Sequence, residues 1–226
     1  GALSVTLEDA GDEPMFEPAP GETPIWQATR VCGLFDGATD PETLRSRLDQ
    51  LLDPALTAGL ELQRLADQAW ERAWLAHFRP LSFGDGRLWI CPGDQQPADP
   101  DPAAMQVRLD PGLAFGTGTH PTTALCLDWL ACHPPTGQRV LDVGCGSGIL
   151  AVVAARLGAT RIRAIDHDPQ ALLATAANAR LNGLAEDAID TALALDETDT
   201  GFDLVLANIL ANVLIDLAPR LATTPR

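Results

Sequence analysis

A glycine-rich turn between two apolar segments constrains this chain more than any other feature. Residues 140–150 read VLDVGCGSGIL, and ATRIRAIDHDP follows at 159–169. The pattern predicts a strand, a tight turn, a helix, a second strand and then the carboxylate of Asp166. Glycines lack a Cβ, so the backbone can bend tightly and a ligand can approach it closely. A carboxylate about 20 residues later is suited to accept hydrogen bonds from ribose hydroxyls. The chain is therefore predicted to bind an adenosine-containing cofactor.

The spacing of the glycines narrows the choice of cofactor. Dinucleotide-binding turns read G-x-G-x-x-G, whereas this turn reads G-x-G-x-G and has Ile149 where the third glycine would fall. No basic residue lies in the turn to meet a pyrophosphate, and Asp142 supplies a carboxylate suited to a cationic amino group. S-adenosylmethionine carries an adenosine, a sulfonium and an amino group but no phosphate, so it is the cofactor that we predict. A tight strand-to-helix turn without a ligand is the alternative.

Composition limits the class of protein. The chain has 226 residues, 46% of them hydrophobic, which is enough for one or two domains with a core. A net charge of −16 argues against a broad nucleic-acid surface, because binding phosphates needs clusters of Lys and Arg. No apolar run approaches the roughly 20 residues of a membrane span. Five scattered cysteines without a C-x-x-C pair indicate neither a zinc site nor a disulfide framework. We expect a cytoplasmic monomer with no metal and no membrane contact.

The first 80 residues are predicted to form a small domain, residues 1–53, and a linker helix, residues 54–80. Apolar residues recur at helical spacing through the linker segment. The elements expected in the small domain are two strands followed by a helix with an Asp-Pro start: 2–9, 25–35 and 41–52.

Residues 81–226 are predicted to form the second domain. It begins with a hairpin around the Asp85-Gly86 turn. Four strands are expected further along, separated by three helices and with no element after the last of them: 139–143, 161–166, 189–193 and 203–207. Strands that alternate with helices indicate a doubly wound parallel α/β sheet. Because ligands bind beyond the carboxyl ends of such strands, the glycine turn, Asp166 and Asn208 should converge on one crevice.

Three segments together resemble one enzyme family. FGTGTHPTTALCLDWL at 115–130, VLDVGCGSGILAVVAARLGA at 140–159 and FDLVLANIL at 202–210 are similar to the bacterial ribosomal protein L11 methyltransferases. The resemblance implies a Rossmann-like class I methyltransferase domain, preceded by a ferredoxin-like α+β domain for substrate recognition. It implies transfer of methyl groups from S-adenosylmethionine to lysine side chains and the amino-terminal amine of this large-subunit ribosomal protein. Relative to the family, the chain looks truncated at both ends.

The resemblance also implies which residues form the site. Asp166 would hold the ribose, and Asn208 would close the site and accept a hydrogen bond from the incoming amine. His120 is a candidate for receiving the proton, the alternative being that it packs in the loop and shapes the cofactor lid. Transfer from a sulfonium releases a neutral thioether, so positioning would supply much of the rate. The residues expected to contact the cofactor are Thr123, Gly144, Gly146, Asp166 and Asn208.

Two other classes of function stay open. One is a methyltransferase that acts on RNA or a small molecule. Enzymes that methylate nucleobase or glutamine amino groups tend to carry N-P-P and an aromatic residue, whereas Ile209 and Leu210 follow Asn208 here. That difference favours a flexible aliphatic amine. The other class is a non-catalytic binding module or a nicotinamide oxidoreductase, which the missing third dinucleotide glycine disfavours.

Overall fold

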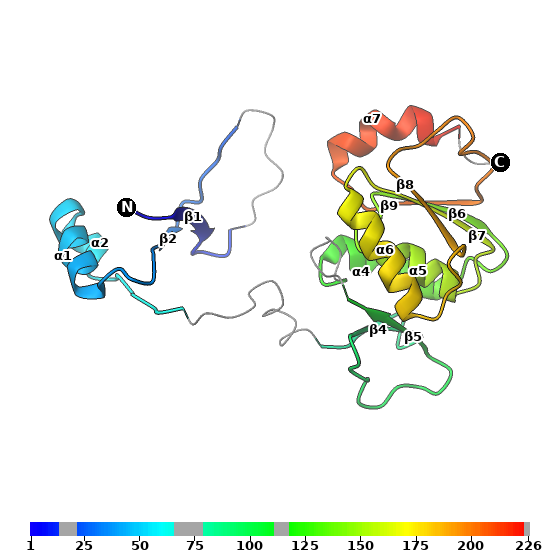
Figure 1. Ribbon diagram of the computed structural model, residues 1–226, viewed down its shortest axis with the longest axis horizontal. Coiled ribbons are helices and arrows are strands. Elements are labelled where there is room, and N and C mark those ends of the chain that lie inside the picture. Colours follow the sequence, from blue (N-terminus) through cyan, green and yellow to red (C-terminus); the bar gives the residue numbers. More distant parts are fainter. Residues whose placement is uncertain (14–21, 66–78, 111–117, 224–226) are drawn as a thin grey trace. The chain divides into compact units, whose positions relative to one another are not determined.

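The chain divides into two compact units, Gly1–Gln68 and Ala69–Arg226. The computed structural model describes residues 1–13, 22–65, 79–110 and 118–223 (Figure 1). The division lies within the segment that was predicted to link two domains.

The first unit contains a two-stranded sheet and two helices. β1 (Ser4–Asp9) pairs antiparallel with β2 (Thr29–Leu34). α1 (Pro41–Leu51) begins after Asp40, whose carboxylate accepts a hydrogen bond of 2.9 Å from the Thr43 backbone N–H. Such a cap satisfies one of the N–H groups that a helix start leaves unpaired. Both predicted strands and the first predicted helix are confirmed, and the ferredoxin-like arrangement stays a prediction.

The predicted linker helix, residues 54–80, is present as one turn at its start and is wrong at residues 60–65. α2 (Pro54–Thr57) is a single turn capped by Asp53, and residues 60–65 are not helical. Gly59 follows α2, and glycine is unfavourable inside a helix because its backbone loses the most conformational freedom. The apolar spacing of this segment predicted a continuous helix and gave no sign that the helix ends here. The rest of the predicted helix, residues 66–78, lies outside the described residues.

A three-stranded sheet opens the second unit, in the order β3-β4-β5. β3 (Leu81–Phe83) and β4 (Leu88–Pro92) form the predicted hairpin, and β5 (Met105–Leu109) pairs parallel with β4. Asp85 and Gly86 in the hairpin turn have positive φ angles of 54° and 86°. β5 forms the edge of this sheet, so one side of its backbone needs partners from elsewhere.

The main sheet of the second unit has four parallel strands in the order β8-β7-β6-β9. The predicted strands are confirmed to within one residue at each end. Their bounds are β6 (Arg139–Val143), β7 (Arg161–Ile165), β8 (Ile189–Ala192) and β9 (Leu204–Ala207). Sequential parallel strands need a crossover connection, and helices supply it from β6 to β7 and from β7 to β8.

Helices cover both faces of this sheet (Figure 1). One face packs on α5 (Ile149–Arg156) and α6 (Pro169–Leu181), and α4 (Pro121–Cys132) packs on α5 and on β3 and β4. The other face packs on α7 (Ala211–Leu221), whose Leu217 and Leu221 contact the apolar cluster there. α7 corrects the expectation that no element follows the fourth strand. Its apolar residues recur at helical spacing, which was a signal for it.

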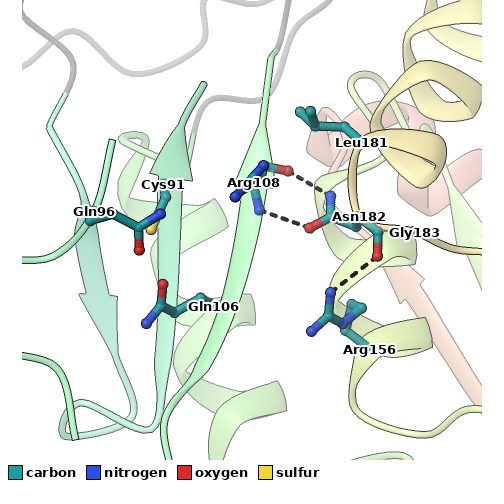
Figure 2. A pocket seen from close by; sticks show the side chains of 8 residues that line it. All are labelled: Cys91, Gln96, Gln106, Arg108, Arg156, Leu181, Asn182 and Gly183. Atoms are coloured by element: carbon teal, nitrogen blue, oxygen red, sulfur yellow. Dashed lines mark hydrogen bonds between the residues drawn. The ribbon is translucent and has the colours of Figure 1, made fainter. Parts of the chain in front are cut away.

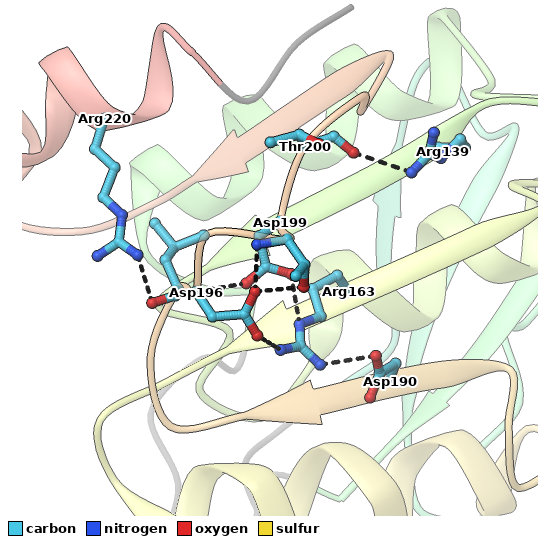
Figure 3. A network of polar contacts seen from close by, with 9 residues as sticks. Arg139, Arg163, Asp190, Asp196, Asp199, Thr200 and Arg220 are labelled. Atoms are coloured by element: carbon cyan, nitrogen blue, oxygen red, sulfur yellow. Dashed lines mark hydrogen bonds and ion pairs between the residues drawn. The ribbon is translucent and has the colours of Figure 1, made fainter.

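The helix expected between β8 and β9 is absent, and a loop at residues 193–203 takes its place. Arg163, with a side chain only 12% exposed, holds this loop (Figure 3). Its guanidinium pairs with Asp190 at 2.7 Å, Asp196 at 3.4 Å and the buried Asp199 at 3.0 Å. The loop is rich in Asp and Thr, whose side chains compete with helical backbone hydrogen bonds. A charge network therefore stabilises the segment that the predicted helix would have occupied.

Candidate functional site

The predicted site residues lie at one edge of the main sheet. The glycine turn follows β6 at Val143, Asp166 follows β7 and Asn208 follows β9. β6 lies between β7 and β9 in the sheet. Because the strands are parallel, all three segments leave from the same carboxyl edge, where ligands of such sheets bind. The expected convergence of these segments is thus present in the fold.

Asp166 ties the glycine turn to the end of β7. Its Oδ2 accepts a hydrogen bond of 2.9 Å from the Gly146 N–H, and its Oδ1 accepts one of 3.0 Å from the Asp168 N–H. The carboxylate is 11% exposed. Two backbone donors therefore orient the carboxylate, and each of its oxygens retains a lone pair for a further donor.

The glycine turn packs closely on both sides. Gly144 has a φ of 73°, and a Cβ there would clash with Ile209, the residue after Asn208. Gly148 has a φ of 77°, and a Cβ there would lie 2.9 Å from the Thr175 Cα on α6. Both positions thus require glycine for the backbone angle and for space. The turn is held between the segment after β9 and α6.

Asn208 and Thr123 were predicted separately, and the structure joins them. The Asn208 Nδ2 donates a hydrogen bond of 2.8 Å to the Thr123 Oγ1. Thr123 is 4% exposed and lies in the first turn of α4. With its amide nitrogen engaged, Asn208 can offer its Oδ1 to another donor. The sequence signals identified both residues but not their contact.

His120 is the N-cap of α4. Its Nδ1 lies 2.7 Å from the Thr122 Oγ1 and accepts a hydrogen bond of 3.3 Å from the Thr122 backbone N–H. The residue is exposed. This arrangement fits the alternative of a loop-shaping residue, because Nδ1 contacts both the hydroxyl and the backbone N–H of Thr122 in the first turn of α4.

Asp142 is buried against α5, contrary to the interpretation that it meets a cationic amino group. It is 1% exposed, and its Oδ2 accepts a hydrogen bond of 3.1 Å from the Ala151 N–H in α5. Side chains alternate along a strand, and this alternation directs Asp142 toward α5. Burial, reinforced by the nearby charge of Asp166, raises its pKa from 3.8 to about 7.

Cys145 is buried in the glycine turn. Burial raises the pKa of its thiol to about 12, so the sulfur is a neutral thiol near pH 7. The interpretation of a small residue that fits the turn is consistent with this burial.

Sequence patterns did not single out two buried amides, Asn178 in α6 and Asn182 at its C-cap. Asn178 and Asn182 lie one turn apart and are 1% and 9% exposed. Their side chains form hydrogen bonds with the backbone at Asp110 and Arg108, along the free edge of β5. The available signal was their i, i+4 spacing in a helix otherwise rich in alanine.

A cavity of about 430 Å³ lies apart from the strand ends (Figure 2). It lies beside β4, β5 and the carboxyl ends of α5 and α6. Arg156 there donates a hydrogen bond of 3.1 Å to the Asn182 carbonyl, so it serves α6 as a carboxyl-terminal partner. The lining residues are Cys91, Gln96, Gln106, Arg108, Arg156, Leu181, Asn182 and Gly183. The cavity is therefore distinct from the predicted crevice.

The sequence profile described as Ribosomal protein L11 methyltransferase (PrmA) matches residues 1–226. The chain belongs to the ribosomal protein L11 methyltransferase family. Curated relatives carry the same name: that of Methylococcus capsulatus is 52% identical over 100% of this chain and 76% of its own length. That of Nitrosococcus oceani is 52% identical over 96% of this chain and 73% of its own length. The predicted methyltransferase is thereby confirmed at the level of the family.

A solved structure of the family supports the fold. The ribosomal protein L11 methylase of Lactobacillus delbrueckii subsp. bulgaricus is 38% identical, with a TM-score of 0.57 over 66% of this chain and 76% of that chain. The mixed α/β fold with a parallel sheet is thus shared with a family member. None of the helices among the described residues is long and apolar enough to cross a membrane.

Proposed function

We propose that the protein transfers methyl groups from S-adenosylmethionine to amines of ribosomal protein L11, namely lysine side chains and the amino-terminal amine. The observation that carries this proposal is the convergence of the glycine turn, Asp166 and Asn208 at one sheet edge in a member of this methyltransferase family. We expect the enzyme to act as a monomer in the cytoplasm.

The chemistry of the crevice fits this cofactor. Asp166 presents an oriented carboxylate to ribose hydroxyls, and Gly144 and Gly146 are the turn residues that we expect to contact the cofactor. The turn has no Arg or Lys, which suits a cofactor without phosphate. When bound, S-adenosylmethionine supplies a methyl group on a sulfonium that departs as a neutral thioether.

The remaining task of the protein is to align a neutral amine. A free lysine amine titrates near ~10.4, and desolvation in a closed crevice lowers that value. Asn208, held by Thr123, offers its Oδ1 as an acceptor for an N–H of the amine. Orientation of this kind accounts for a large part of the rate in such a displacement.

The test uses the full-length enzyme, S-adenosylmethionine and unmethylated ribosomal protein L11, followed by intact-protein mass spectrometry. We expect methyl-sized mass steps with the wild type and none with Asp166→Ala. Asp168→Asn is the matched control, because Asp168 caps α6 through its Oδ1 and Asn preserves such a cap. An unchanged protein mass together with label in RNA or a small molecule would reject the proposed substrate.

A further inference from the structure

One buried side chain joins the glycine turn to the end of β5. The Asn178 Nδ2 donates hydrogen bonds of 2.8 Å to the Ser147 carbonyl and 3.0 Å to the Asp110 carbonyl. Its Oδ1 accepts a hydrogen bond of 2.8 Å from the Asp110 N–H. The side chain is 1% exposed. Both of its N–H groups and its oxygen are therefore engaged with backbone groups from two separate segments.

Asn182, the C-cap of α6, makes a similar set of contacts four residues further along the chain. Its Nδ2 donates to the Arg108 carbonyl at 2.7 Å and to the Asn178 carbonyl at 2.8 Å, and its Oδ1 accepts from the Arg108 N–H at 2.8 Å. Figure 2 shows the Asn182 pair with β5. The two amides thus replace a neighbouring strand along the edge of β5. They differ in that Asn178 also binds the glycine turn.

The turn depends on α6 at a second point. The Thr175 Oγ1 donates a hydrogen bond of 3.2 Å to the Gly146 carbonyl. Adjacent carbonyls of the turn, at Gly146 and Ser147, are therefore both satisfied from α6. Because buried carbonyls are costly to leave unpaired, α6 favours one conformation of the turn.

Described residues next to β5 and α4 also contact elements of the predicted site. Asp110 follows β5 and is held by Asn178. Gly118 precedes α4 and packs toward Ile149, the first residue of α5 after the glycine turn, and Thr123 in α4 bonds to Asn208. These contacts link the end of β5 and the start of α4 to the predicted site.

We propose that Asn178 is a positioning residue for cofactor binding, which rests on the proposed function of the crevice. It holds the glycine turn and Asp110 in one arrangement before the cofactor arrives. Binding then does not have to order the turn, and affinity gains by that amount. Asn182 stabilises the same strand edge without contacting the turn, so its contribution is to stability alone.

The test compares Asn178→Ala with Asn182→Ala in the full-length enzyme. Both variants lose three side-chain hydrogen bonds from buried positions, one inside α6 and one at its C-cap, so their thermal midpoints should fall by similar amounts. Calorimetry should show S-adenosylmethionine binding weakened about tenfold or more in Asn178→Ala and nearly unchanged in Asn182→Ala. In steady-state assays KM for the cofactor should rise in Asn178→Ala, while kcat at saturating cofactor stays close to wild type.

Equal cofactor affinities in the two variants would overturn the proposal, whatever their stabilities. Asp166→Ala is measured alongside: if it binds the cofactor normally, the proposed crevice is wrong, whereas lost binding there with equal affinities for the Asn variants rejects only the role of Asn178. Should Asn178→Ala not fold, Asn178→Ser and Asn182→Ser answer the same question with a smaller change in volume.

Discussion

The side-chain amide of Asn208 donates a hydrogen bond of 2.8 Å to the hydroxyl of Thr123, although the residues lie 85 positions apart. Asn208 follows β9 and Thr123 lies in the first turn of α4, so the contact joins two elements across the site. It leaves the Asn208 oxygen available in an orientation that depends on α4. The proposed contact with the amine therefore involves both residues.

Asn208→Ala should lower turnover more than cofactor affinity. The amide oxygen would be lost to the amine, and misplacement by about 1 Å can cost about 100-fold in rate. Thr123→Val should give a smaller loss of kcat, because it frees the amide without removing it. Asn212→Ala, at an exposed position on α7, is the control for both. Unchanged kcat in Asn208→Ala would remove Asn208 from the mechanism.

His120→Ala should lower the free energy of unfolding by about 1 kcal/mol, the usual cost of a lost N-cap. His120→Asn should restore stability and turnover, because Asn is a favourable cap. Chemical denaturation and steady-state assays on both variants measure this. If stability recovers in His120→Asn but turnover stays low, His120 has the proton-accepting role instead.

Asp142 should make the protein less stable as pH rises. Its carboxyl is harder to ionise when folded, with a pKa of about 7 against 3.8. The contribution of this carboxyl to the free energy of unfolding is therefore fully present below about pH 4, and it is lost as the pH rises through about 7. At pH 8, Asp142→Asn should raise the free energy of unfolding by up to about 4 kcal/mol and so raise the thermal midpoint. At about pH 4 the substitution should have little effect. The exposed Asp187→Asn is the control, and a pH-independent effect of Asp142→Asn would contradict the buried carboxyl.

Arg163→Met should destabilise the second unit by about 3 kcal/mol, since the buried Asp199 loses its cation. The loop at 193–203 should also become more sensitive to proteolysis. Arg161→Met, an exposed change two residues earlier in β7, is the matched control. Equal denaturation midpoints for the two variants would show that the network has no net effect on stability.

The sequence was informative where local patterns decide the structure. The four strands of the main sheet, the glycine turn and the carboxylate after β7 depend on short apolar runs and on residues with special backbone freedom. These signals extend over a few neighbouring residues. They also place Asp166 and Asn208 at strand ends once the strands are known to be parallel.

Local patterns predicted the wrong structure where the deciding residue was far away in the sequence or lay within another pattern. Gly59 interrupts an apolar spacing that otherwise predicts a long helix, and the loop held by Arg163 replaces a helix that simple alternation of elements would supply. The carboxylates that hold this loop come from another strand and from the loop itself. Alternation of elements carries no information about such ion pairs.

By itself, the sequence determined the strands, the parallel sheet and the cofactor class that the turn favours. The tertiary structure decided that Asn208 meets Thr123, that Asn178 joins the turn to β5, and that Asp142 is buried against α5. Each of these contacts links residues whose distance depends on strand order and on how helices pack against the sheet. Those choices depend on burial and hydrogen bonding over the whole unit, and no single segment encodes them.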